Sequence, residues 1–161
     1  MTLLMLLVAA ASLAADLATK AAAKAYLTEK TIRVLPGLLE LRLTHNDGMA
    51  LGILSGNLIA GIFLPLAVVI GGWFLLRRYQ PQIFTRVSMG LILGGFLGNF
   101  WQRLTLGYVV DMIYLPFLPW FVCNVADVAI CFGVAMLVIS LLLRPGDWRE
   151  KDAKDCGNRE A

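Results

Sequence analysis

The sequence predicts an all-α membrane protein with four transmembrane helices and a small β-sheet outside the membrane. Its composition is 59% apolar and only 16% charged, with a mean hydropathy of +0.75, whereas soluble domains carry charge on about a quarter of their residues. Four long apolar runs are separated by polar segments, and one of those segments alternates apolar and charged residues. The 161 residues suffice for one such domain over residues 1–144, followed by a polar tail over 145–161.

The first apolar run covers about residues 2–27. A cleaved secretory signal peptide carries positive charge before its apolar stretch, but no Lys or Arg precedes Lys20. The run is therefore predicted to stay in the protein as a membrane span. The Ala-rich stretch Ala9–Ala15 resembles a cleavage site, so a signal peptide is the alternative.

The other apolar runs cover about residues 58–76, 87–106 and 121–143, and each approaches the roughly 20 residues that cross a hydrocarbon core. Four spans place both termini on one side of the membrane. The middle loop and the tail hold eight Lys and Arg residues, against six on the other side. Because the positive-inside rule assigns the richer side to the cytoplasm, both termini are predicted to be cytoplasmic, with residues 24–57 and 107–120 facing outward.

The segment over about residues 30–45 has a different pattern. Leu39–Thr44 reads Leu-Glu-Leu-Arg-Leu-Thr, and a Pro36-Gly37 turn separates it from a shorter run. Alternation next to a turn is typical of a β-hairpin or small sheet, and its mixture of charged and apolar residues suits the membrane surface. An ordinary linker outside the membrane is the alternative.

Three glycines in the third apolar run share one face of the predicted helix. Gly90, Gly94 and Gly98 recur at every fourth position. Small residues at this spacing let membrane helices approach closely, so the pattern predicts tight packing rather than chemistry.

Polar residues of the predicted spans, together with Asn46 in the loop predicted to enter the second span, gather at the outer boundary of the membrane. Most occur in pairs one helical turn apart, which puts both members on one face. Each pair could be only a helix-end ion pair or hydrogen bond, but a carboxylate in an apolar setting is costly and marks a candidate functional site. The residues are Asp16, Lys20, Asn46, Asn99, Arg103, Asp111, Asn124 and Asp127, with Asp111 and Asp127 at the outer ends of the third and fourth runs.

The two outermost carboxylates, Asp111 and Asp127, indicate acid–base chemistry. If they lie close together, both cannot easily ionise and they titrate as a pair. The ionised member then takes a proton from water while the protonated member polarises a carbonyl, as in aspartic proteases. The single histidine, His45, is predicted to be a hydrogen-bonded loop residue.

Other classes of site have little support in the sequence. The three cysteines, Cys123, Cys131 and Cys156, lack metal-ligand spacing and are predicted to be small apolar fillers and one tail thiol. No metal, cofactor or disulfide is therefore expected. The chain also has no Lys/Arg-rich tract with interleaved aromatics, so nucleic acid is not an expected partner.

From about residue 16 to residue 133 the chain resembles the lipoprotein signal peptidase family, also called signal peptidase II. The resemblance rests on four motifs in order, which together are far more specific than any one of them. They are Asp16-Leu-Ala-Thr-Lys20 for D-x-x-[ST]-K, Asn46-Asp-Gly-Met-Ala50 for N-x-G-x-A, Gly98-Asn99 with Arg103 and Val109-Val110-Asp111 for the third motif, and Asn124-Val-Ala-Asp127 for N-x-A-D.

The resemblance implies an aspartic endopeptidase of the bacterial inner membrane. Such enzymes remove signal peptides from prolipoproteins, cutting just before a cysteine that carries diacylglycerol. The implied partners are lipid-modified signal peptides and membrane lipids, and a monomer is expected. The implied fold adds a sheet cradle and a short outer loop or helix over the site. Asp111 and Asp127 would be catalytic; Asp16, Lys20, Asn46, Gly48, Asn99, Arg103, Asn124 and Ala126 would shape the site.

Three positions depart from the family pattern. Gln102 replaces an acid that would pair with Arg103, and Leu51 and Cys123 stand where Phe is common. A catalytically impaired homologue that binds lipoproteins is therefore one alternative. A transporter or channel subunit is another, but it needs polar residues through the depth of the bundle, and residues 64–75 and 134–143 are nearly all apolar.

Overall fold

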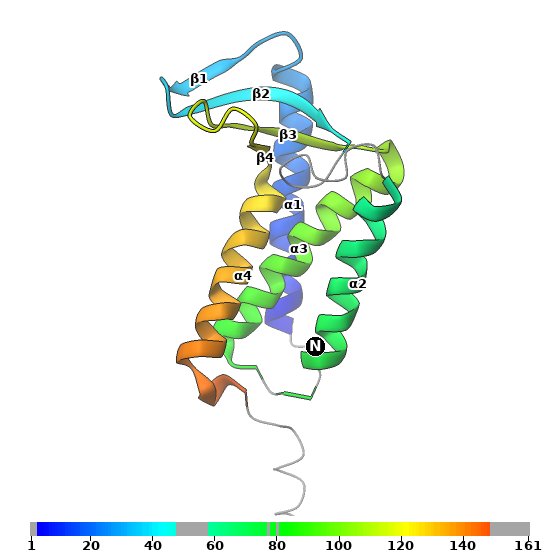
Figure 1. Ribbon diagram of the computed structural model, residues 1–161, viewed down its shortest axis with the longest axis vertical. Coiled ribbons are helices and arrows are strands. Elements are labelled where there is room, and N and C mark those ends of the chain that lie inside the picture. Colours follow the sequence, from blue (N-terminus) through cyan, green and yellow to red (C-terminus); the bar gives the residue numbers. More distant parts are fainter. Residues whose placement is uncertain (1–2, 48–57, 77, 80, 149–161) are drawn as a thin grey trace, which may run out of the picture.

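The computed structural model describes residues 3–47, 58–76, 78–79 and 81–148. In this part of the chain four α-helices form a bundle, and a four-stranded sheet lies across one end of it (Figure 1). The predicted combination of helices and a small sheet is thus confirmed. The helices are α1 (Leu3–Tyr26), α2 (Leu58–Leu76), α3 (Ile83–Leu106) and α4 (Val125–Leu143), with the short 3-10 helix η2 (Pro145–Asp147) after α4.

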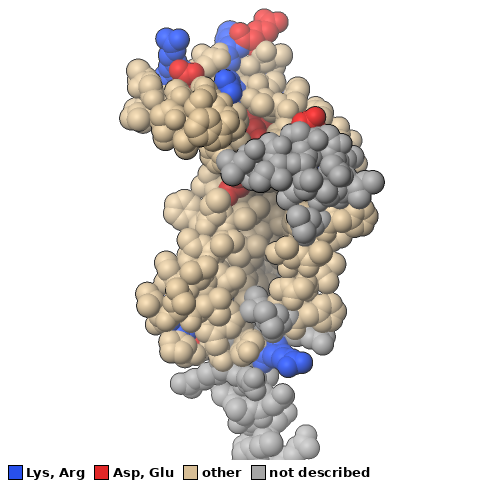
Figure 2. Space-filling model, viewed as in Figure 1, with Lys and Arg blue, Asp and Glu red and all other residues tan. Residues whose placement is uncertain are grey.

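Three of the helices are long and apolar enough to cross a membrane. These are α1, α3 and α4, and the described residues of α2 include the shorter apolar stretch Pro65–Phe74. Charged side chains gather at the two ends of the visible face, and the bundle between them is mostly uncharged (Figure 2). This distribution is the one expected when the middle of a protein faces lipid. The crossing of the membrane by all four helices stays a prediction.

The α3 helix is the centre of the bundle, because α1 and α4 both pack closely against it. A Cβ atom at Gly94 would collide with the carbonyl oxygen of Ala9 in α1, and one at Gly95 would collide with that of Ala126 in α4. Backbones can approach this closely only where the side chain is absent. The predicted packing role of the glycine-rich face is confirmed.

The sheet is antiparallel, in the order β1-β2-β3-β4. Its strands are β1 (Ile32–Leu35), β2 (Leu39–Asn46), β3 (Val109–Tyr114) and β4 (Val122–Cys123). The first two strands form the predicted hairpin, and Gly37 in the turn has φ 73°, a left-handed conformation that glycine adopts without steric cost.

The outer segment after the third apolar run differs from the sequence prediction. It contains β3 and β4, so Asp111 lies on a strand rather than at the end of a helix. Asn46 is likewise the last residue of β2 and not part of a loop. The physical reason is long-range pairing: β3 completes the free edge of β2, with Thr44 opposite Asp111. For the same reason α4 starts at Val125, after β4.

A small apolar core fixes the sheet to the end of α1. Ala23 and Leu27 on the α1 side pack with Val110 and Met112 of β3, and all four are buried. Burial of apolar surface of this kind is the main favourable term in folding. It places β3, and therefore Asp111, directly over the end of the bundle.

Candidate active site

The side chain of Asp111 is held by two amide groups. It is 1% exposed; the Nδ2 atom of Asn124 donates to its Oδ1 at 2.6 Å, and the Nδ2 atom of Asn46 donates to its Oδ2 at 2.8 Å. Each carboxylate oxygen thus has one neutral donor. Such donors stabilise the charge while leaving the remaining lone pairs available.

Asp127 lies in the first turn of α4 and takes part in a capping box. Its backbone N–H donates to Oδ1 of Asn124 at 2.9 Å, and the backbone N–H of Asn124 donates to Oδ2 of Asp127 at 3.1 Å. This reciprocal arrangement satisfies two N–H groups at the helix start. The other oxygen, Oδ1, accepts from Nδ2 of Asn99 at 2.8 Å. The helix start therefore fixes the position of the second carboxylate.

Asn124 is the residue that brings the two carboxylates together. Its side chain donates to Asp111 at 2.6 Å while its backbone donates to Asp127 at 3.1 Å. The same Nδ2 atom also lies 3.2 Å from Oδ1 of Asn99. Because both acids hydrogen-bond to this one residue, the structure brings Asp111 and Asp127 into the same cluster.

A buried ion pair supports this arrangement from α1. Lys20 is 1% and Asp16 0% exposed, and Nζ of Lys20 lies 2.7 Å from Oδ2 of Asp16. The prediction that Asp16 and Lys20 share one face of the first helix is confirmed. Oδ1 of Asp16 accepts from the backbone N–H of Ala126 at 2.9 Å. The ion pair thus connects α1 to the first turn of α4.

Lys20 also sets the orientation of the Asn99 amide. Its Nζ donates to Oδ1 of Asn99 at 2.8 Å, so the carbonyl end of this amide faces the cation. The NH₂ end then faces Asp127, to which it donates. A turned amide would put NH₂ against a cation and leave Asp127 facing a carbonyl oxygen, an arrangement that loses both hydrogen bonds.

Burial and a neighbouring charge perturb the acid on β3. Burial raises the pKa of Asp111 from 3.8 to about 6, and the charge of Asp127 acts in the same direction. The hydrogen bonds from Asn46 and Asn124 and the charge of Lys20 oppose this rise in pKa. An acid with a pKa near 6 exchanges protons close to neutral pH, which is a property of groups that serve in acid–base catalysis.

Gln102 has a contact that the sequence did not predict. It is 6% exposed, and its Oε1 accepts from the backbone N–H of Val110 at 2.9 Å. The side chain therefore holds the strand residue next to Asp111. No sequence signal indicates this contact, because only the path of β3 over α3 brings the two residues together.

The remaining predicted residues fall into three groups. Arg103 lies in the last turn of α3 and is partly buried, and its predicted role at the site stays a prediction. Gly48 and Leu51 are outside the described residues. His45, predicted in a loop, is instead on β2, where the centroids of its ring and of the Tyr108 ring lie 4.4 Å apart.

Cys123 of β4 is buried beside the site. Burial raises the pKa of its thiol to about 12, and the charges of Asp127 and Asp111 act in the same direction. A thiol that stays protonated is a poor nucleophile and a poor metal ligand. Cys123 therefore acts as an apolar filler, as predicted.

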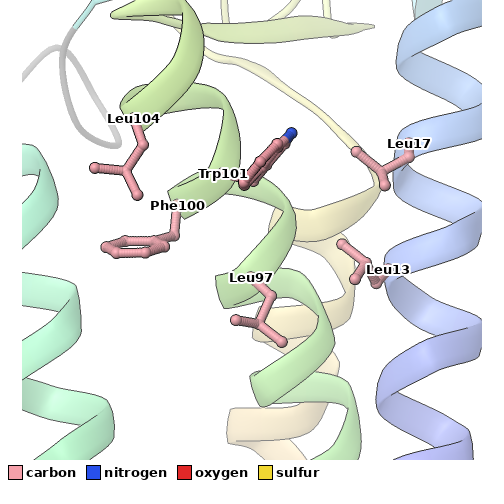
Figure 3. Close-up of a pocket in the computed structure, with 6 residues that line it drawn as sticks. All are labelled: Leu13, Leu17, Leu97, Phe100, Trp101 and Leu104. Carbon is pink, nitrogen blue, oxygen red and sulfur yellow. The ribbon is translucent and has the colours of Figure 1, made fainter.

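An apolar pocket lies elsewhere, between α1 and α3 (Figure 3). Its volume is about 360 Å³, and none of its lining side chains ionises. It therefore has no group for acid–base chemistry, and the polar cluster around Asp111 and Asp127 is the better candidate site. The lining residues are Leu13, Leu17, Leu97, Phe100, Trp101 and Leu104.

Long apolar helices with a buried polar cluster at one end define the class: an integral membrane protein with a candidate active site at the end of its helix bundle. Comparisons with known proteins identify the family. Residues 8–143 match the family model described as signal peptidase (SPase) II, and the chain belongs to this family. Membership implies a peptidase.

Individual relatives agree with the family model. The chain is 34% identical over 124 residues to a lipoprotein signal peptidase of Streptococcus thermophilus, covering 76% of this chain and 77% of the relative. It is 37% identical over 122 residues to a lipoprotein signal peptidase of Desulfitobacterium hafniense, covering 73% and 78%. A solved structure described as a bacterial membrane enzyme superposes with a TM-score of 0.77 at 29% identity, covering 91% of this chain and 92% of the other.

Proposed function

We propose that the protein is an intramembrane aspartic endopeptidase that removes signal peptides from diacylglyceryl-modified bacterial prolipoproteins. Cleavage would occur just before the lipidated cysteine. The observation that carries this proposal is the sharing of Asn124 by two carboxylates, the buried Asp111 and the partly buried Asp127. The names of the relatives, which are lipoprotein signal peptidases, support the substrate class.

The proposed reaction uses one proton shared between the two acids. The ionised carboxylate removes a proton from a water molecule, and the water oxygen attacks the scissile carbonyl carbon. The protonated carboxyl donates to the carbonyl oxygen, so that charge developing there is stabilised. When the tetrahedral intermediate collapses, the C–N bond breaks and the nitrogen takes the proton that came from water. The products are a carboxyl end on the signal peptide and a free amine on the cysteine.

The surrounding residues would keep the pair in this geometry. Asn46, Asn99 and Asn124 donate to the carboxylates, and the ion pair of Asp16 and Lys20 fixes Asn99 and the start of α4. Positioning of this kind lowers the barrier because no reorganisation is needed during the reaction. Gly48, Arg103 and Ala126 are proposed to shape the site next to the substrate.

The proposed topology has four spans in the bacterial inner membrane with both termini in the cytoplasm. The single domain would cover residues 1–144, with a polar cytoplasmic tail over 145–161. The site then lies at the outer interface, where a lipidated substrate can arrive laterally from the membrane. The protein is proposed to act as a monomer on substrate and lipid alone.

The test is cleavage of a purified prolipoprotein in vesicles, followed by mass spectrometry of the products. We expect one cut, directly before the cysteine, in the diacylglyceryl-modified precursor. The unmodified precursor and the Asp127→Asn variant serve as controls, and neither should give product. A cut at another bond, or equal cleavage of the unmodified precursor, would contradict the proposed activity.

A further inference from the structure

Four large apolar side chains are exposed at one end of the sheet. Their exposed fractions are 53% for Leu35, 57% for Leu38, 57% for Phe117 and 68% for Trp120. These residues belong to the strands and their connections and not to the membrane-crossing helices. We call this group the sheet tip.

The strand register shows that the four residues share one end of the sheet. Leu35 pairs with Leu39 across the β1–β2 turn, which contains Leu38. Further along, Glu40 pairs with Tyr114, and Tyr114 pairs with Val122. The β3–β4 connection, with Phe117 and Trp120, therefore turns at the same end as the β1–β2 hairpin. In Figure 1 both turns project on the α4 side of the bundle.

The other end of the sheet has different surroundings. There Asn46 pairs with Val109, and Val110 packs on Ala23 and Leu27 of the α1 end. That end is fixed to the bundle and carries the candidate site. At the sheet tip the described part of the chain leaves four large apolar side chains exposed at one end of the sheet, and exposed apolar side chains that gather in one region often mark an interaction site.

We propose that the sheet tip inserts into the headgroup region of the outer leaflet of the membrane that the helices cross. The first argument is continuity with the lipid-facing surface of α4. Trp120 precedes Val125, the first residue of α4, by five positions, so it lies within about 17 Å of that helix start. The exposed apolar face of α4 begins soon after, at Val128 and Phe132.

The second argument is the chemistry of the tip and its neighbours. Tryptophan at the interface keeps its apolar rings in lipid and its N–H in the polar headgroup layer. Arg33 lies on β1 beside Leu35, and its side chain is 77% exposed although it contacts Glu40 at 3.4 Å. An exposed guanidinium attracts lipid phosphates. Apolar side chains beside a cation suit the interface rather than the hydrocarbon core.

Contact with lipid would hold the second end of the sheet. The sheet would then be fixed by the bundle at the candidate site and by the membrane at the sheet tip, so the height of β3 above the hydrocarbon would be set at both ends. This inference rests on the membrane orientation proposed above, but it does not depend on the cleavage chemistry.

The test uses nitroxide spin labels on the full chain in vesicles of phosphatidylethanolamine and phosphatidylglycerol. One label is placed through Leu38→Cys and another through Trp120→Cys, with Cys123→Ala, Cys131→Ser and Cys156→Ser in the background. A label through Glu29→Cys, at an exposed position after α1, is the matched control. Collision rates are measured with oxygen, which concentrates in lipid, and with a nickel chelate, which stays in water.

We expect the oxygen-to-nickel collision ratio at positions 38 and 120 to exceed that at position 29 at least threefold. Equal ratios at all three positions would overturn the proposal, because the sheet tip would then lie in water. Low collision rates with both reagents would also overturn it, because a protein partner or a second copy would then cover the tip. Cleavage is measured separately, so loss of the proposed activity and loss of lipid contact are distinguishable. Thermal unfolding confirms that each labelled chain is folded.

Discussion

Two polar clusters lie at opposite ends of the helix bundle, and they differ in what their acids contact. We call them the sheet-end cluster and the tail-end cluster. The sheet-end cluster consists of Asp16, Lys20, Asn99, Asp111, Asn124 and Asp127, and the tail-end cluster consists of Thr85, Ser140, Arg144 and Asp147.

The tail-end cluster surrounds one acid with partners. Oδ2 of Asp147 accepts from Thr85 at 2.9 Å and from Ser140 at 3.3 Å, and it lies 3.3 Å from Nε of Arg144. Three partners on one oxygen, including a cation, offset the cost of burying this carboxylate. These contacts tie η2 to α3 and α4, so the cluster has the properties of a structural connection.

The sheet-end cluster instead places two acids on a shared partner. Asp111 and Asp127 are held by neutral amides, while the cation Lys20 contacts Asp16 and Asn99. Burial, together with the charge of Asp127, raises the pKa of Asp111 to about 6. Burial of a carboxylate does not by itself mark chemistry, because Asp147 is buried in a structural connection. Two acids on one shared partner, one of them with a raised pKa, are the stronger indication.

The largest effect among the supporting residues is predicted for Asn124. Asn124→Ala removes the side-chain donor to Asp111 and keeps the backbone donor to Asp127, so Asp111 loses its position relative to Asp127 and kcat/KM for prolipoprotein cleavage should fall about 100-fold or more. The variant also loses a helix cap, at a cost of about 1 kcal/mol.

Asn124→Ser separates these two effects. A serine caps the helix, but its side chain is too short to replace the amide donor to Asp111. It should restore the melting temperature and leave the rate low. If the serine variant cleaves at the wild-type rate, Asn124 acts only as a cap.

Lys20 is predicted to act through Asn99. Lys20→Met removes the group that orients the Asn99 amide, and we expect a 10- to 100-fold loss of kcat/KM. It also leaves Asp16 buried without a cation, which typically destabilises a protein by about 3–5 kcal/mol. Cleavage kinetics and thermal unfolding measure the two effects.

The double variant Asp16→Asn with Lys20→Met distinguishes positioning from stability. It removes the unpaired charge, so most of the lost stability should return while the rate stays low. Recovery of the rate together with stability would mean that Lys20 has only a structural role.

The pH dependence of cleavage is predicted to report on Asp111. Because one proton on the pair is required, kcat/KM should fall about tenfold per pH unit above about pH 6. The hydrogen bond from Asn46 lowers the pKa of Asp111, so Asn46→Ala should raise this pKa and move the falling limb to higher pH. His45→Ala, at the neighbouring position of β2, is the control and should leave the limb in place. If the falling limb moves in His45→Ala and not in Asn46→Ala, the limb does not report on Asp111.

The smallest effect is predicted for Gln102. Gln102→Leu leaves the N–H of Val110 buried without an acceptor, at a cost of about 1–3 kcal/mol, and we expect a loss of rate of about fivefold. Gln102→Glu keeps an acceptor and should retain stability. Its added negative charge should raise the pKa of Asp111 and move the falling limb of the kcat/KM profile to higher pH. Equal stability of the leucine variant and the wild type would remove Gln102 from the set of supporting residues.

Local patterns in the sequence predict the helical parts of the site well. Asp16 and Lys20 are four positions apart on α1, and Asn124 and Asp127 are three apart at the start of α4. Helical geometry alone places such residues side by side. The apolar runs likewise predict the helices, because an apolar run of about 20 residues is typical of a membrane-spanning helix.

Contacts that depend on long-range pairing cannot be predicted from local patterns. Asn46 reaches Asp111 across 65 positions and Lys20 reaches Asn99 across 79, so no local pattern indicates either contact. The sequence predicts a loop where β3 lies, because this strand forms by pairing with β2, which is distant in sequence. The contact of Gln102 with Val110 depends in turn on where β3 lies.

The most direct test of the catalytic pair compares Asp111, Asp127 and Asp147 in one cleavage assay. Asp111→Asn, Asp127→Asn and Asp147→Asn each remove one negative charge and keep the side-chain shape, and thermal unfolding verifies that each variant is folded. We predict a loss of kcat/KM of at least about 1,000-fold for Asp111→Asn and Asp127→Asn, and a change of less than about threefold for Asp147→Asn. Cleavage near the wild-type rate by either Asp111→Asn or Asp127→Asn would contradict the assignment of the catalytic pair.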